Sequence, residues 1–357
     1  MKSQNSLYFV NPFVDFALIG GISLVCYVGL TLSFGPKASA TALSLSLLLQ
    51  WVINWPHFSA TSYRLFRSKE NIRQYSLTTW LIPLLVLMGI GFSLELPESV
   101  APYFVKVFMI WSPYHFSAQS VGLTLIYARR AGVSVSRLTR FCISASIFGT
   151  YLLATVRAET SSERMSYHGI YYPGFGLPSW TVTAANIWFV LGAVGFGIFA
   201  LRWSIKHRKL LPPIILLPAV TQCVWFLFGY QTPSFYIFVP LFHSLQYLMI
   251  AWVMQLKEKQ TQQSGPIERH YVTRESLRWY AINLAGGALL FFLLPRVFSS
   301  FGYEASFALG VVIAGVQIHH FFVDGVIWKL KNPSVANPLM VNLSEFKVDQ
   351  DNLKVAA

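Results

Sequence analysis

The chain has 357 residues, of which 54% are hydrophobic, 16% aromatic and only 11% charged. This composition is too apolar for a soluble domain and is typical of a protein with many membrane-spanning segments. The net charge of +13 does not indicate nucleic-acid binding, because Lys and Arg occur in short runs between apolar segments rather than in one patch.

About ten apolar segments are long enough to span a bilayer as helices, which takes roughly 20 residues each. In chain order they cover residues 13–34, 41–63, 78–96, 101–127, 138–156, 180–201, 211–230, 235–256, 279–298 and 303–328. The sequence therefore predicts an all-α, polytopic membrane helix bundle with about ten transmembrane helices.

The basic residues alternate along these segments. Runs of Lys and Arg follow every second segment, as at Arg64–Arg73 and Arg129–Arg140, while the connections between them are nearly free of positive charge. Cytoplasmic loops carry such an excess of Lys and Arg. We therefore expect a multi-pass protein of the cell membrane with both termini in the cytoplasm.

The domain organisation follows from the same pattern. We expect residues 1–331 to form one transmembrane domain, in which a loop at 257–278 separates eight helices from a final pair. The loop contains the run Gln-Gln-Ser-Gly-Pro, which is typical of a flexible connection. Residues 332–357 are predicted to form a short, polar cytoplasmic tail.

Four histidines lie in four different apolar segments, all of which run toward the same membrane face: His57, His115, His243 and His320. Counted back from the basic residues that follow each segment, their depths differ by only roughly 7 Å at 1.5 Å per helical residue. A single membrane histidine is usually a hydrogen-bond donor between helices. Four at one depth instead predict a shared metal or haem site.

Polar neighbours of these histidines complete the predicted site. Asp324 follows His320 by one helical turn and could orient it, bind the metal itself or cap the helix. His319 is a further candidate ligand or a packing donor. Gln119 and Gln246 stand one turn after a histidine each and could orient it, so Asp324 and Gln119 are candidate catalytic residues.

The donor types restrict the metal. The zinc-protease motif HExxH, the hydrolase motif GxSxG and the phosphate-binding GxxxxGK[ST] are all absent from the sequence. Imidazoles with few carboxylates suit iron or copper, with zinc possible, and two histidines could instead hold haem b. Iron is the cofactor we expect.

Several of these contexts occur together in one known family. The motifs are Pro56-His57, His115-Phe116, Phe242-His243-Ser244 and His320-x-x-x-Asp324. Their order and spacing resemble the Brp/Blh family of membrane proteins, which cleave β-carotene to retinal using iron. The resemblance spans much of helices two to ten, carried by about nine motif residues.

Three departures accompany this resemblance. Phe58 replaces the family's glycine after Pro-His, and the carboxylate that follows it in the family has no counterpart here, with Thr61 nearby. Tyr247 stands where the family has a further histidine, four residues after His243, which makes Tyr247 a candidate catalytic residue. The resemblance implies iron-dependent oxygen chemistry.

Four functions compete for this sequence. The first is an iron oxygenase that combines O2 with a lipid-soluble substrate such as a carotenoid, isoprenoid or acyl chain. The others are a b-type haem electron carrier, a metal-ion transporter with histidines along its path, and a structural protein whose histidines pack helices.

Overall fold

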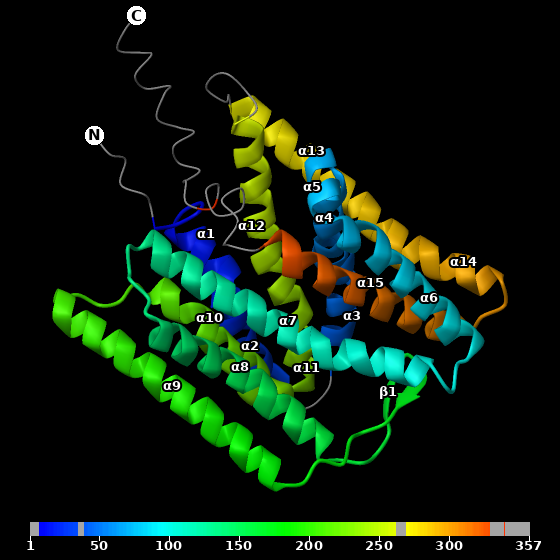
Figure 1. Ribbon diagram of the computed structural model, residues 1–357, viewed down its shortest axis with the longest axis horizontal. Coiled ribbons are helices and arrows are strands. Elements are labelled where there is room, and N and C mark those ends of the chain that lie inside the picture. The colour runs from blue at the N-terminus through cyan, green and yellow to red at the C-terminus, as the bar shows by residue number, and fades with distance from the viewer. Residues whose placement is uncertain (1–6, 35–38, 262–268, 329–338, 340–357) are drawn as a thin grey trace, which may run out of the picture.

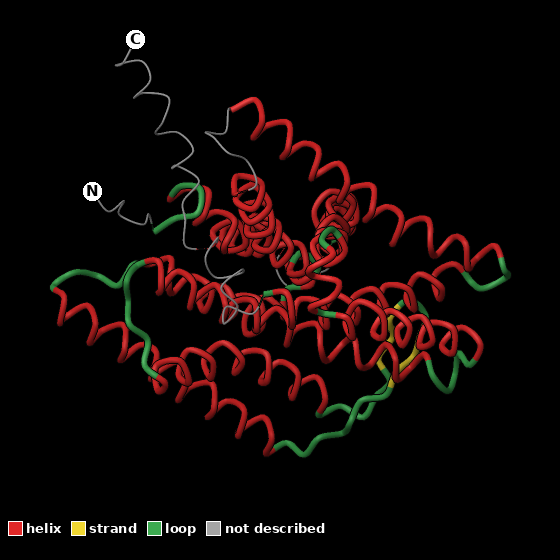
Figure 2. Tube along the Cα trace, turned by 45° about the horizontal axis from the view of Figure 1, so that its top comes forward, coloured by secondary structure: helices red, strands yellow, loops and turns green. Residues whose placement is uncertain are grey.

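The computed structural model describes residues 7–34, 39–261, 269–328 and 339, and nearly all of them are helical (Figures 1 and 2). Within these residues, eight helices are long and apolar enough to cross a membrane. The runs 40–66 and 101–130 are also long helices but are not among the eight. They carry His57 and His115 with other polar residues, which lower their hydropathy. The predicted all-α membrane bundle is confirmed, while the number of ten helices stays a prediction.

The helices of the first half are α1 (Pro12–Phe16), α2 (Ile22–Phe34), α3 (Ala40–Leu49), α4 (Trp55–Phe66), α5 (Lys69–Gln74), α6 (Ile82–Glu95), α7 (Ala101–Arg130) and α8 (Arg137–Glu159). Those of the second half are α9 (Trp180–His207), α10 (Pro213–Cys223), α11 (Pro233–Tyr236), α12 (Val239–Thr261), α13 (Arg269–Ala288), α14 (Leu294–Ser300) and α15 (Ala305–Ile327). Wider π-helical turns and one 3-10 turn extend some of them: η1 (Ala17–Gly21), η2 (Gln50–Asn54), η3 (Leu77–Leu81), η4 (Val224–Phe228), η5 (Gly229–Gln231, 3-10) and η6 (Leu289–Leu293).

Three of the π-helical turns, η2, η3 and η6, end just before a proline. Pro56, Pro83 and Pro295 each stand at the start of the α-helix that follows. Proline has no backbone N–H, and its ring collides with the carbonyl one turn earlier. A widened turn removes that collision and keeps the remaining backbone groups bonded inside the helix, which an apolar solvent requires.

The outer surface of the bundle is apolar. On α9, which lies beside α8 at the edge of the molecule (Figure 1), the exposed side chains recur every three to four residues. They are Ile187, Leu191, Val194, Ile198, Leu201 and Ile205. An outward apolar stripe of this length would be costly in water and is favourable in lipid. The bundle is therefore built for a bilayer.

The connection between α8 and α9 contains the only strands of the described residues, an antiparallel hairpin of β1 (Met165–Tyr167) and β2 (Ile170–Tyr172). Its turn, His168-Gly169, has positive φ at both residues, as two-residue hairpins require. A buried ion pair fixes the start of this connection: Lys106 Nζ, on α7, lies 2.5 and 2.6 Å from the two carboxylate oxygens of Glu159, the last residue of α8.

Arg130, at the end of α7, joins distant parts of the chain. Its Nε donates to the carbonyl of Leu7 (3.1 Å), Nη2 to that of Tyr8 (2.7 Å) and Nη1 to that of Leu339 (2.6 Å). Leu339 is fully buried. The rest of the predicted tail, 332–357, lies outside the described residues.

The predicted loop 257–278 is shorter in the structure, because α12 and α13 extend into it from both sides. Residues 262–268 lie outside the described residues. Polar side chains support the extensions: Gln255 donates to Glu275 (2.7 Å), and Glu275 pairs with Arg278 (2.8 Å) one turn further on. The i,i+3 pair Glu275–Arg278 stabilises α13 locally, and the bond from Gln255 joins α13 to α12.

Candidate metal centre

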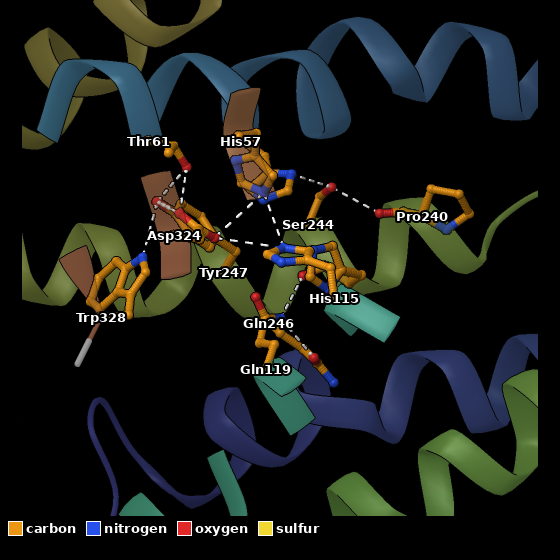
Figure 3. Close-up of polar contacts among 12 residues, drawn as sticks. His57, Thr61, His115, Gln119, Pro240, Ser244, Gln246, Tyr247, Asp324 and Trp328 are labelled. Atoms are coloured by element: carbon orange, nitrogen blue, oxygen red, sulfur yellow. Dashed lines mark hydrogen bonds and ion pairs between the residues drawn. The ribbon is translucent and has the colours of Figure 1, made fainter. Parts of the chain in front are cut away.

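The structure brings the four predicted histidines together, each from a different helix: His57 from α4, His115 from α7, His243 from α12 and His320 from α15. Figure 3 shows His57 and His115 with the polar residues around them. All four are buried, and one possible ligand atom from each lies within 4.8 Å of the others. This confirms the convergence that their equal depth in the sequence predicts.

The spacing suits a single ion. The facing Nε2 atoms of His115 and His320 are 3.1 Å apart, and the ring centroids of His57 and His320 are 4.4 Å apart. Metal–nitrogen bonds of about 2.0–2.1 Å place two ligands of one ion roughly 3–4 Å from each other. Small ring rotations therefore suffice to close four imidazoles around one ion.

Several ring nitrogens have no hydrogen-bond partner among the described residues: His57 Nε2, His320 Nδ1 and both nitrogens of His243. Leaving a buried polar atom unbonded costs about 1–3 kcal/mol. Four such atoms together cost a sizeable part of the 5–15 kcal/mol by which a typical protein is stable. One ion can bond to His57 Nε2 and to one nitrogen of each other ring, which would offset part of this cost, so the residues fit a metal.

A hydrogen bond at Nδ1 orients the ring of His57. Its Nδ1 lies 3.0 Å from the hydroxyl of Ser244, which is also 2.8 Å from the carbonyl of Pro240 (Figure 3). The same hydroxyl is 2.8 Å from Asn54 Oδ1. With two acceptors already beside Ser244, the hydroxyl oxygen is left to accept from His57 Nδ1–H. The proton is then on Nδ1, and the lone pair of Nε2 faces the other histidines.

Asp324 lies beside the histidines, as its spacing from His320 predicts. Its Oδ2 is 3.4 Å from His320 Nε2 and 3.6 Å from His115 Nε2. Its Oδ1 faces the hydroxyls of Thr61 (3.1 Å) and Tyr247 (3.3 Å). The carboxylate is therefore near enough to serve as a further ligand or to hold the two imidazoles.

Tyr247 joins this group from α12. Its hydroxyl lies 2.6 Å from Thr61 Oγ1 and accepts from Trp328 Nε1 at 3.3 Å, and its ring centroid is 4.4 Å from that of His57 (Figure 3). The side chain expected from its sequence position is thus at the site, with its hydroxyl directed to the carboxylate of Asp324.

The two glutamines have other partners than expected. Gln119 Nε2 donates to the carbonyl of His243 (3.1 Å) and to Gln246 Oε1 (2.9 Å). Gln246 Nε2 in turn donates to the carbonyl of Ile19, in the π-helical turn η1. These amides therefore connect α7, α12 and η1, and the backbone of α12 is held by Gln119 at the point where it presents His243.

His319 is not part of the four-histidine group of the described residues. As the neighbour of His320 on a helix, its side chain points about 100° away. Ser244, which sequence reasoning did not assign to the site, directly follows His243, and only the packing of α12 beside α4 brings it to His57. Its position in the Phe242-His243-Ser244 motif was the available signal.

A cavity of about 300 Å³ lies against the site, between α7, α12 and α15. His115, Gln119, Tyr247 and Asp324 form its polar side. Its other lining residues are aliphatic, aromatic or glycine: Trp111, Tyr114, Ala118, Gly122, Leu123, Ile126, Ile250, Phe321, Gly325, Trp328 and Leu339. An apolar chamber with a few convergent polar groups is the usual form of a ligand site.

Comparisons with protein-family models, curated proteins and solved structures find no match for this chain. The fold and the site together define a helical membrane protein with a buried four-histidine group able to hold a metal ion.

Proposed function

We propose that this protein is a membrane-embedded, histidine-ligated iron oxygenase that acts on a lipid-soluble substrate such as a carotenoid, an isoprenoid or an acyl chain. The observation that carries the proposal is the junction of the four histidines with the apolar cavity, since His115 belongs to both. His57, His115, His243 and His320 would hold the iron, and Asp324 would bind it or hold the imidazoles beside it. When bound, iron would supply the activation of O2.

Tyr247 and Asp324 also face the cavity, where a substrate would meet the metal. In a dioxygenase reaction that cleaves a C=C bond of the substrate to two carbonyl groups, both atoms of O2 enter the products and the substrate supplies all four electrons, so no external reductant is needed. The cavity would exclude water and bring an apolar substrate to the metal from the bilayer. We further propose that the protein lies in the cell membrane with both termini in the cytoplasm.

The geometry favours a bare ion over haem. A haem held by two histidines needs the space between their rings for the porphyrin. Here the ligand atoms of all four histidines lie within 4.8 Å of one another, so whichever two are taken as haem ligands, the other two stand where the porphyrin would lie. It also disfavours a transport path, because ligands along a path are staggered through the membrane, whereas these converge on one point.

The resemblance to the Brp/Blh family supports the same chemistry. Its motif residues lie on four separate helices, and their histidines face one another in this structure. Tyr247 stands where the family has a histidine, and its hydroxyl faces Asp324. The proposed substrate class is therefore wider than β-carotene.

The test is elemental analysis of the purified protein with an optical spectrum, followed by O2 consumption with candidate lipids. We expect close to one iron per chain, no Soret band, and loss of the iron in His115→Ala. His207→Ala, at the exposed end of α9, is the matched control. Absence of stoichiometric metal, with no difference between the two variants, would refute the proposal, and a Soret band would favour the haem alternative.

A further inference from the structure

Two glycines of the cavity wall have no packing reason to be glycine. Gly122 on α7 and Gly325 on α15 both line the cavity. A Cβ atom added at either position would meet no heavy atom of the described residues within 4 Å. Since glycine inside a helix costs about 1 kcal/mol relative to alanine, the empty space beside them needs another explanation.

Other glycines of the bundle do have a packing reason. A Cβ at Gly192 would lie 2.4 Å from the backbone N of Ser146, and one at Gly315 would lie 2.6 Å from Ile90. These positions allow two helices to approach closely. Gly122, which is half-buried, and Gly325, which is exposed, instead leave space in the cavity wall, and this space adjoins the metal site because His115 and Asp324 line the same cavity.

The cavity extends along α7. Gly122 lies about two helical turns beyond His115 on the same face of the helix, which corresponds to roughly 10 Å. Leu123, Ile126 and Ile250 form the wall there, so this arm of the cavity is apolar. Its apolar lining suits a hydrocarbon chain.

On the other side of the site, Trp111 and Tyr114 line both this cavity and a second, more open one of about 290 Å³. The second cavity also borders Val107, which is 48% exposed, and Tyr114 itself is 45% exposed. The exposed surface of the bundle faces lipid, so a chain that leaves the cavity past this aromatic pair would enter the bilayer.

We propose that Gly122 and Gly325 are specificity-determining residues, which keep open the arm of the cavity that receives one end of a long, extended apolar chain. The chain passes the metal site beside His115 and Asp324 and leaves toward the membrane past Trp111. This inference rests on the proposed function for the chemistry at the site, but the binding of the chain does not require the metal.

The experiment uses the full chain in lipid nanodiscs and straight-chain fatty alcohols of increasing length that carry a diazirine at the end of the chain. Photolabelled residues are identified by mass spectrometry in wild type, Gly122→Leu and Gly325→Leu. Gly197→Leu on α9 is the matched control, because an added Cβ also meets no described atom there but the residue lines no part of this cavity. Iron content is measured on the same samples.

We expect long probes to label α7 and α15 near Gly122 in wild type. Each leucine variant should lose this labelling about tenfold, which corresponds to roughly two methylene groups excluded from the cavity. Short probes and Gly197→Leu should be unaffected. Should a leucine variant fail to fold, as judged by size-exclusion chromatography, Gly122→Ala should give a smaller loss in the same direction.

Labelling that is unchanged in both variants, or reduced equally for short and long probes, would overturn the inference. The proposed function fails separately. Wild type without iron that still shows length-selective labelling refutes the oxygenase and keeps the chain site, whereas an iron-loaded protein with no length selectivity does the reverse.

Discussion

Ser244 provides the sharpest test of how the site is held. Its hydroxyl lies 3.0 Å from His57 Nδ1 and is the contact that directs the other nitrogen of His57 toward the remaining histidines. Ser244→Ala removes this contact and leaves a buried N–H unbonded in the metal-bound orientation. We expect weaker metal binding while all four histidines remain.

The magnitude follows from the partners that are lost. A hydrogen bond contributes about 0.5–1.5 kcal/mol net, and an unbonded buried group costs about 1–3 kcal/mol. Loss of a group that orients a metal ligand typically weakens metal affinity about 10–100-fold, which is about 1.4–2.7 kcal/mol. Both routes lead to the same range, so we expect Kd to rise by one to two orders of magnitude.

The assay is anaerobic titration of the metal-free protein in detergent with Fe²⁺ against a competing chelator. Ser117→Ala is the matched control. Ser117 is equally buried and donates to the carbonyl of Pro113 and to Gln222 Oε1, but among the described residues it has no hydrogen bond to any of the four histidines. A folded Ser244→Ala that binds iron as tightly as Ser117→Ala would show that the hydroxyl does not orient His57 for the metal.

Three further predictions concern the scaffold. Lys106→Met should lower the free energy of unfolding by about 3–5 kcal/mol, because it leaves the buried Glu159 unpaired, and the double variant with Glu159→Gln should recover most of that loss. Denaturant unfolding in detergent measures both variants. A Lys106→Met variant as stable as wild type would contradict the role of the ion pair. Gly192→Ala should destabilise the α8–α9 contact by about 1–3 kcal/mol, because its Cβ would lie 2.4 Å from the backbone of α8; an unchanged melting temperature would argue against that close packing. Backbone N–H groups at the start of α15 lower the pKa of Glu304, so its stabilising effect is present above the unfolded pKa of about 4.3 and is lost as pH falls through the lower folded value. The melting-temperature difference between wild type and Glu304→Gln should therefore be present near neutral pH and vanish in acid; a difference that does not depend on pH would refute it.

Much of the fold could be predicted from the sequence because the bilayer imposes length and hydropathy on every spanning helix. The same constraint makes histidines inside apolar segments stand out in the sequence. Counting residues back from the basic flank of each helix places His57 and His320 at the same depth in the membrane. Depth along a helix is a sequence quantity. Rotation about the helix axis is also set by π-helical turns and packing, which is why the partners of Gln119 were not predicted.

The π-helical turns show this limit most clearly. Each inserts an i→i+5 bond, so the residues that follow no longer keep the face that a regular period assigns to them. The turn η2 ends three residues before His57, and η1 supplies the carbonyl that holds Gln246. Pro56 marks the position of η2 in the sequence. The turn η1 contains no proline, and its position depends on tertiary contacts.

The guanidinium of Arg130 has a consequence for how two distant segments of the chain are held. Its hydrogen bonds to Leu7 and Leu339 tie the segment before α1 and a residue beyond α15 to one side chain at the end of α7. The two segments are therefore coupled through a shared donor, so that a shift of this one side chain would disturb both.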